Sequence, residues 1–98
     1  MQLTPLKCHA LKALVAHQAP ALVKCRGGFR PSTQPADGGD VIHVRTVRAL
    51  EADQLLEFDD AQFPSEARLT PRGIDAAREA VGPRRAHQVE QLAKAVLQ

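Results

Sequence analysis

The chain has very few aromatic residues. Its 98 residues include no tryptophan, no tyrosine and only three phenylalanines, Phe29, Phe58 and Phe63. A β-sandwich usually needs more aromatic and β-branched side chains than this. A core of Leu, Val, Ile and Ala instead favours helices packed on a small sheet. At this length we expect one domain with a single modest core.

Long apolar runs and cysteine are scarce as well. No stretch approaches the roughly 20 apolar residues that a transmembrane helix needs. Lysines and histidines interrupt the N-terminal stretch, which therefore lacks the apolar core of a signal peptide. We expect a cytoplasmic protein without a membrane partner, in which Cys8 and Cys25 are reduced thiols.

The sequence shows no pattern of an enzyme or of a metal site. Cys8, His9, His17 and Cys25 lack the spacing of zinc ligands, which usually come in pairs about two to four residues apart. These residues also lack a third group that would orient a Cys–His pair for catalysis. Gly27-Gly28 lacks the Lys and Ser/Thr of a phosphate-binding loop. We expect no enzyme activity, no metal and no cofactor.

Charges of opposite sign are separated along the chain. Residues 1–50 hold seven basic and two acidic side chains, whereas residues 51–70 hold one basic and six acidic ones. Residues 71–98 hold five basic and three acidic side chains. This distribution indicates either a site for a polyanion beside a repelling edge, or charge-complementary self-association.

Start and stop patterns predict four helices. Thr4-Pro5 and Thr70-Pro71 each place an N-capping threonine before a proline in the first helical turn. Pro20 ends the first helix, and Gly82-Pro83 separates the third helix from the last. The predicted helices span residues 5–17, 43–54, 71–81 and 84–97.

Between the helices, the sequence predicts a small antiparallel sheet and therefore an α+β fold. Residues 55–58 are strand-like, and residues 66–69 alternate apolar and charged side chains, so the two segments form a predicted hairpin. An extra strand or hairpin is expected at 21–30. The Gly/Pro-rich residues 26–40 are expected to form a loop. Residues 41–42 lead into the second helix as a short extended segment.

One stretch carries a more specific pattern. It reads Thr46-Val47-Arg48-Ala49-Leu50-Glu51-Ala52-Asp53-Gln54-Leu55-Leu56, and thirteen residues after Leu56 comes Leu69-Thr70-Pro71-Arg72-Gly73. Residues 43–82 thereby resemble winged-helix DNA-binding proteins of the MarR-like, ArsR-like and phage-regulator kinds. In these proteins a recognition helix precedes a hairpin called the wing, and "L-T-x-x-G" opens the next helix. The resemblance implies a winged-helix domain over residues 1–82, followed by a C-terminal amphipathic helix within 83–98.

The resemblance places Arg45, Thr46 and Arg48 on the part of the recognition helix that faces the DNA groove. The spacing agrees, because Arg45 and Arg48 lie three residues apart and project from roughly one face of a helix. Arginine is the side chain best suited to guanine edges and phosphates. The wing is mostly acidic and so disfavours DNA. We therefore expect Arg26 and Arg30, in the preceding loop, to supply further DNA contacts.

These patterns favour a small protein that binds double-stranded DNA, as a transcriptional regulator or an accessory factor of a mobile element. The alternative is an adaptor that uses the same fold for protein contacts through its acidic residues 51–66. One feature departs from the family, since residues 26–40 stand where a helix usually precedes the recognition helix. The apolar stripe of helix 84–97 either pairs with a second copy in a homodimer, which we favour, or packs on helix 5–17.

Overall fold

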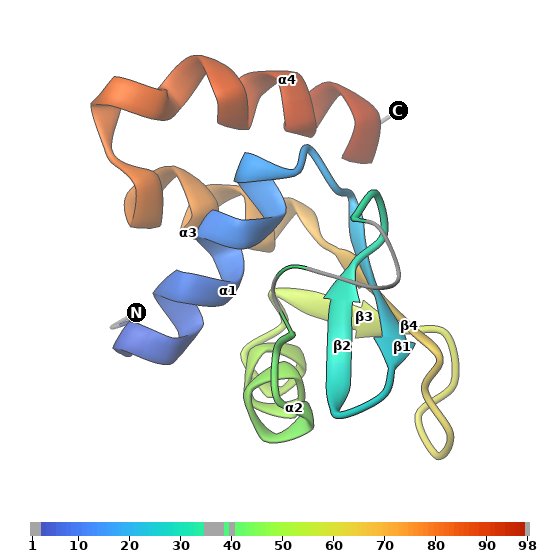
Figure 1. Ribbon diagram of the computed structural model, residues 1–98. Coiled ribbons are helices and arrows are strands. Elements are labelled where there is room, and N and C mark those ends of the chain that lie inside the picture. The colour runs from blue at the N-terminus through green and yellow to red at the C-terminus, as the bar shows by residue number, and fades with distance from the viewer. Residues whose placement is uncertain (1–2, 35–38, 40, 98) are drawn as a thin grey trace.

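The computed structural model describes residues 3–34, 39 and 41–97. They form four α-helices, a short 3-10 helix and a four-stranded antiparallel sheet (Figure 1). In chain order the elements are α1 (Pro5–Ala16), β1 (Ala21–Cys25), β2 (Gly28–Pro31), α2 (Val44–Ala52), β3 (Leu56–Phe58), β4 (Glu66–Leu69), α3 (Pro71–Val81), η1 (Pro83–Arg85) and α4 (Ala86–Val96). The α+β class, the four helices and both hairpins are thus confirmed. The loop expected over residues 26–40 is wrong for Gly28–Pro31, which form β2 by pairing with β1, and its residues 35–38 and 40 lie outside the described part of the chain. No helix among these residues combines the length and the hydropathy of a membrane span.

The sheet has the strand order β2-β1-β4-β3. Because successive strand residues point to opposite faces, Leu22, Phe29 and Ala67 lie on the buried face, whereas Arg30 lies on the other. The segment before α2 also pairs with β2. The Ile42 N–H donates to the Phe29 carbonyl at 2.6 Å, and the Phe29 N–H donates to the Ile42 carbonyl at 2.8 Å. The predicted extended segment at 41–42 is therefore confirmed.

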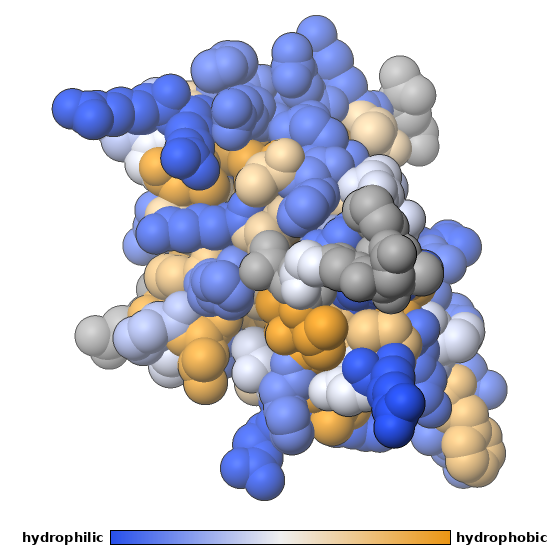
Figure 2. Space-filling view, in the orientation of Figure 1, coloured by the Kyte–Doolittle hydropathy of each residue, from blue (hydrophilic) through white to orange (hydrophobic). Residues whose placement is uncertain are grey.

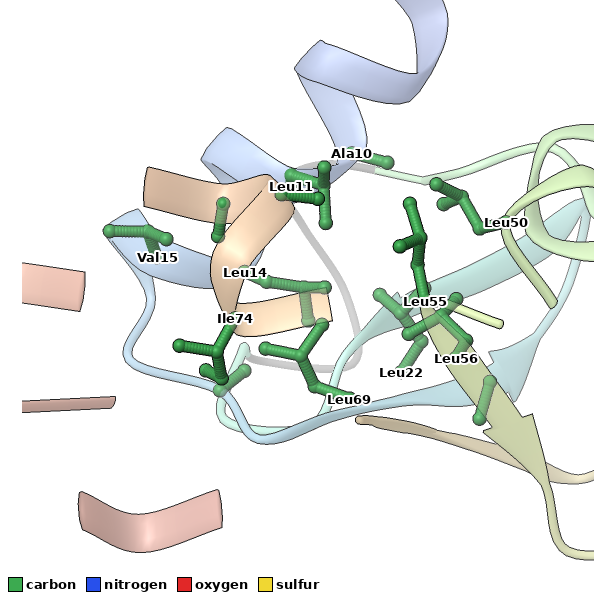
Figure 3. Close-up of a cluster of buried hydrophobic side chains, with 14 of the residues drawn as sticks. Ala10, Leu11, Leu14, Val15, Leu22, Leu50, Leu55, Leu56, Leu69 and Ile74 are labelled. Carbon is green, nitrogen blue, oxygen red and sulfur yellow. The ribbon is translucent and has the colours of Figure 1, made fainter. Parts of the chain in front are cut away.

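The core lies between the helices and the buried face of the sheet. Figure 3 shows aliphatic side chains from α1, α2, α3 and the strands pointing toward one another. Of the three phenylalanines, only Phe29 is fully buried, and its ring centre lies 6.4 Å from that of the partly buried Phe58. The aliphatic core predicted from composition is what the structure contains.

The last helix packs on its own chain. α4 lies across α3 and the end of α1 (Figure 1), and its Val89, Leu92 and Ala93 are at most 5% exposed. An ion pair of 2.6 Å joins Arg78 of α3 to Glu90 of α4. Most of the apolar stripe is therefore covered within the chain, by α3 and also by α1, the helix named in the second of our two alternatives. These contacts give no support to the homodimer that we expected through this helix.

Gly73 allows α3 to pack directly on the backbone. A Cβ atom at this position would lie 2.2 Å from the Leu55 carbonyl oxygen. The neighbouring Thr70 joins the same elements, because its hydroxyl donates to the Gln54 carbonyl at 2.6 Å and its N–H donates to the Leu55 carbonyl at 3.1 Å. The Thr70 hydroxyl oxygen also accepts the Gly73 N–H at 3.0 Å, which caps α3. These contacts fix α3 against the end of α2.

We predict that Gly73→Ala lowers the free energy of unfolding by about 2 kcal/mol, because overpacking of this kind typically costs about 1–3 kcal/mol. Alanine's better helix propensity offsets at most about 1 kcal/mol of that loss. Urea denaturation measures the change. Glu79→Ala, on the exposed side of α3, is the matched control and should change stability by less than about 0.5 kcal/mol. Equal stability of the two variants would contradict the backbone contact.

Candidate nucleic-acid interface

α2 buries one side and exposes the other. Val47 and Leu50 are fully buried. Residues three apart share a helix face, and Arg45 and Arg48 accordingly project together from the opposite side, where both are exposed. Thr46 lies beside them and is partly buried. The side chains predicted to face a DNA groove therefore lie on the outer surface of α2.

Local contacts position both arginines. His43 caps α2, because its Nδ1 accepts the Arg45 N–H at 3.1 Å. The guanidinium carbon of Arg48 lies 5.8 Å from the centre of the Phe58 ring, a cation–π contact worth about 0.5–1 kcal/mol at an exposed site. Among the described residues, neither Arg45 nor Arg48 forms an ion pair. Both charges are thus available to a partner.

The β1–β2 turn brings Arg26 beside the start of α2. A Cβ atom on Gly28 would lie 2.2 Å from the Ile42 carbonyl oxygen, so the turn packs tightly against the segment that leads into the helix. Arg26 is exposed in this turn. Two exposed valines lie in the same region, on either side of His43. We define the basic patch as Arg26, Val41, Val44, Arg45 and Arg48.

Arg30 does not join the basic patch. Its side chain lies on the face of the sheet opposite Phe29, and its Nη1 donates to the Gln34 carbonyl at 2.5 Å. Gln34 follows the end of β2 that is farther from the Arg26 turn. The sequence grouped Arg26 and Arg30 because both lie in one basic segment. Arg26 lies in the turn, whereas Arg30 lies within β2 and is directed to the other face of the sheet, so the two side chains are apart.

The loop between β3 and β4 is organised around the carboxylate of Asp59. Its Oδ1 accepts the N–H groups of Asp60, Ser65 and Glu66 at 2.9, 3.0 and 3.1 Å, and its Oδ2 accepts from the Ser65 hydroxyl. Hydrogen bonds to the ionised form stabilise it. They lower the pKa of Asp59 from 3.8 to about 2, with the Ser65 hydroxyl making the largest contribution.

The second aspartate of this loop holds its tip. Asp60 Oδ1 accepts the N–H groups of Gln62 and Phe63 at 2.9 and 3.2 Å. Pro64 is buried, whereas the Phe63 side chain is 80% exposed. The sequence predicts a turn from Asp59-Asp60 to Pro64-Ser65 but does not reveal that the turn exposes Phe63. The one indication in the sequence is a pair of aspartates, Asp59-Asp60, shortly before an isolated aromatic residue.

The described residues contain no cluster of three or more His, Cys, Asp or Glu side chains that is arranged to bind a metal ion. Cys8 and Cys25 are free thiols and both are partly buried. The basic patch and the exposed Phe63, at one end of the molecule, are the features on which a proposal of function can be based.

The structure predicts how the β3–β4 loop responds to pH. Because the pKa of Asp59 is lowered from 3.8 to about 2, its ionised carboxylate stabilises the loop above pH 3.8 and that contribution is lost as the pH falls through about 2. An NMR titration of the Asp59 carboxyl carbon measures this pKa directly. Ser65→Ala should raise the pKa toward 3.8, whereas Ser32→Ala should leave it unchanged. A wild-type value near 3.8 would show that the hydrogen bonds are absent.

Comparison with known proteins gives no relative. No protein-family model matches the chain, and neither a curated protein nor a solved structure matches it.

Proposed function

We propose that this chain is a winged-helix protein that binds double-stranded DNA by placing α2 in the major groove. One observation carries the proposal: α2 exposes Arg45 and Arg48 on a single face with no ion-pair partner among the described residues. The order of the elements supports it, because α2 is followed directly by the β3–β4 hairpin and by α3, which Thr70 caps. This is the order of the family that residues 43–82 resemble.

Each residue of the proposed interface has a separate role. An α-helix fits the width of the major groove, where arginine forms paired hydrogen bonds with guanine. Arg45 and Arg48 occupy that position on α2, and Thr46 supplies a hydroxyl beside them. Arg26, in the neighbouring turn, contacts a phosphate and fixes the orientation of the helix on the duplex. A protein of this size would serve as a transcriptional regulator or as an accessory factor of a mobile element.

The surroundings of α2 restrict how DNA can approach. Glu57, Asp59 and Asp60 are exposed on β3 and the loop that follows it, and their charges repel phosphates. The contact is therefore restricted to α2 and the β1–β2 turn. In the described residues between β2 and α2 there is no helix that could act as the first half of a helix-turn-helix. The Phe29–Ile42 bridge supports the start of α2 instead.

Fluorescence polarisation with a labelled duplex tests the proposal. The wild-type protein should bind at low salt, and the logarithm of its binding constant should fall linearly with the logarithm of the salt concentration. Arg45→Ala/Arg48→Ala should weaken binding by about tenfold or more. It should also relax the preference for guanine at the contacted positions, because both side chains read base edges. Arg26→Ala, which removes one phosphate contact, should instead reduce the salt slope by about 0.9.

Arg84→Ala/Arg85→Ala is the matched control, because it removes two adjacent exposed arginines that lie in η1 and not on α2. This variant should bind like the wild type. Circular dichroism shows whether loss of the Arg48–Phe58 contact affects folding. Absence of binding at low salt, or equal loss of affinity in the two double variants, would refute DNA binding through α2.

One observation favours a second function, protein binding without DNA. Phe63 is exposed among carboxylates on the β3–β4 loop, and isolated aromatic anchors are typical of protein contacts. The same titration separates the two functions, since an adaptor would not change the polarisation of any duplex at low salt.

A further inference from the structure

Two surfaces of opposite charge lie side by side at one end of the molecule. The Lys24 N–H donates to the Ser65 carbonyl at 2.8 Å, which joins the end of β1 to the β3–β4 loop. Arg48 of α2 contacts Phe58, directly before that loop. Figure 1 shows α2, the β1–β2 turn and the β3–β4 loop together at the lower end of the view. The basic patch and the acidic loop therefore belong to one continuous face.

Both surfaces carry exposed apolar side chains. In the basic patch, Val41 is 51% exposed and Val44 is 38% exposed, while Phe63 is 80% exposed on the loop. Figure 2 shows apolar atoms in the middle of the molecule, between α1 and β2, and again at the tip of the β3–β4 loop. A few isolated apolar residues are normal on a surface. Among the described residues, however, the exposed charges on α2 and the β1–β2 turn beside the two valines include Arg26, Arg45 and Arg48, whereas Asp59 and Asp60 lie in the loop that carries Phe63.

We propose that this end of the molecule binds a second copy of the chain, with the acidic loop and Phe63 of each copy seated on the basic patch of the other. A two-fold dimer requires one surface that is complementary to itself. A face with a basic half and an acidic half meets that requirement, because a rotation of 180° places each half opposite its complement. Phe63 then contacts Val41 and Val44 of the second copy.

The chemistry around Phe63 favours this partner over others. Asp59 and Asp60 lie in the loop that carries Phe63, and the exposed Glu57 precedes it on β3. Their negative charge repels nucleic acid and anionic lipid. Two cations lie near this loop among the described residues: Arg68 is paired with Glu66 at 2.8 Å, and Lys24 lies at the end of β1. A fitting partner therefore has an apolar centre and a basic rim. The basic patch of this chain has both.

The proposed dimer contact is small, and this determines its affinity. It consists of one loop, one turn and one helix end, which places it below the roughly 1,200 Å² that stable complexes bury. We therefore expect a weak dimer that forms at high protein concentration. Because exposed charges are screened within about 10 Å at 0.1 M salt and about 3 Å at 1 M, the dimer should dissociate as salt increases.

Self-association does not rest on DNA binding, although both use Arg26, Arg45 and Arg48. The two are tested separately, because Phe63 contributes to the dimer alone. Phe63→Ser should weaken self-association about tenfold or more and leave the DNA titration unchanged. A failure of DNA binding would therefore leave the dimer proposal intact.

Sedimentation velocity of the full chain, from about 10 µM to about 1 mM at low salt, covers the range of weak association constants. The wild type should shift from monomer to dimer. Phe63→Ser should weaken dimerisation about tenfold or more, as expected for an aromatic anchor. Leu97→Ser is the control, because Leu97 is also exposed, at 53%, but follows α4 at the opposite end of the molecule.

Mixing two variants tests which surfaces meet. Arg26→Glu/Arg45→Glu makes the basic patch acidic, whereas Glu57→Lys/Gln62→Lys places basic side chains at exposed positions of β3 and the loop and keeps Asp59 and Asp60, which hold the loop. Neither variant should dimerise alone, because both contacts of each homodimer then oppose like charges. An equimolar mixture should form a heterodimer, because each of its two contacts again pairs opposite charges.

Four results would overturn the proposal. These are a wild-type monomer at about 1 mM in low salt, unchanged dimerisation of Phe63→Ser, an equal loss with Leu97→Ser, and a mixture that associates no better than its components. Circular dichroism of each variant confirms that its fold is retained, and both substituted surfaces are exposed, so folding does not depend on them.

Discussion

The position of α2 depends on the contact between Gly73 and the Leu55 carbonyl. Without a side chain at residue 73, α3 approaches the chain where it leaves α2, and Thr70 adds hydrogen bonds to the carbonyls of Gln54 and Leu55 at the same point. The left-handed Gln54 lies at this point, with φ of 65°, and reverses the chain from α2 into β3. The junction therefore sets the angle at which α2 presents its arginines, and also the position of the β3–β4 hairpin beside them.

The acidity of the β3–β4 loop has a structural cause. A seven-residue connection leaves several N–H groups without strand partners, and the carboxylates of Asp59 and Asp60 accept most of them. Lysine or arginine at these positions would have no acceptor to offer. The negative charge that separates this loop from a typical basic wing is thus a consequence of how the loop folds. Any partner that binds this loop must therefore be compatible with its negative charge.

Local patterns predicted most of the fold. Threonine-proline caps and the Gly82 stop depend only on neighbouring residues, so the helices they bound lie where the sequence placed them. The position of α4 was less predictable, because periodicity identifies an apolar stripe but not the surface that covers it. Arg30 was grouped with Arg26 because sequence distance does not reveal strand register. The outward direction of Phe63 depends on hydrogen bonds to Asp60, which composition cannot show.

The two proposed uses of the basic patch exclude each other, and the balance between them follows from charge density. Duplex DNA presents about one negative charge per 1.7 Å of its axis and releases condensed counterions when it is bound. The acidic loop offers three exposed carboxylates, Glu57, Asp59 and Asp60, and has no comparable counterion atmosphere. We therefore expect DNA, if it binds as proposed, to displace the loop of a second copy from the three arginines. In this scheme the dimer is the form adopted without DNA, and its loops protect the basic patch from other polyanions until a duplex replaces them.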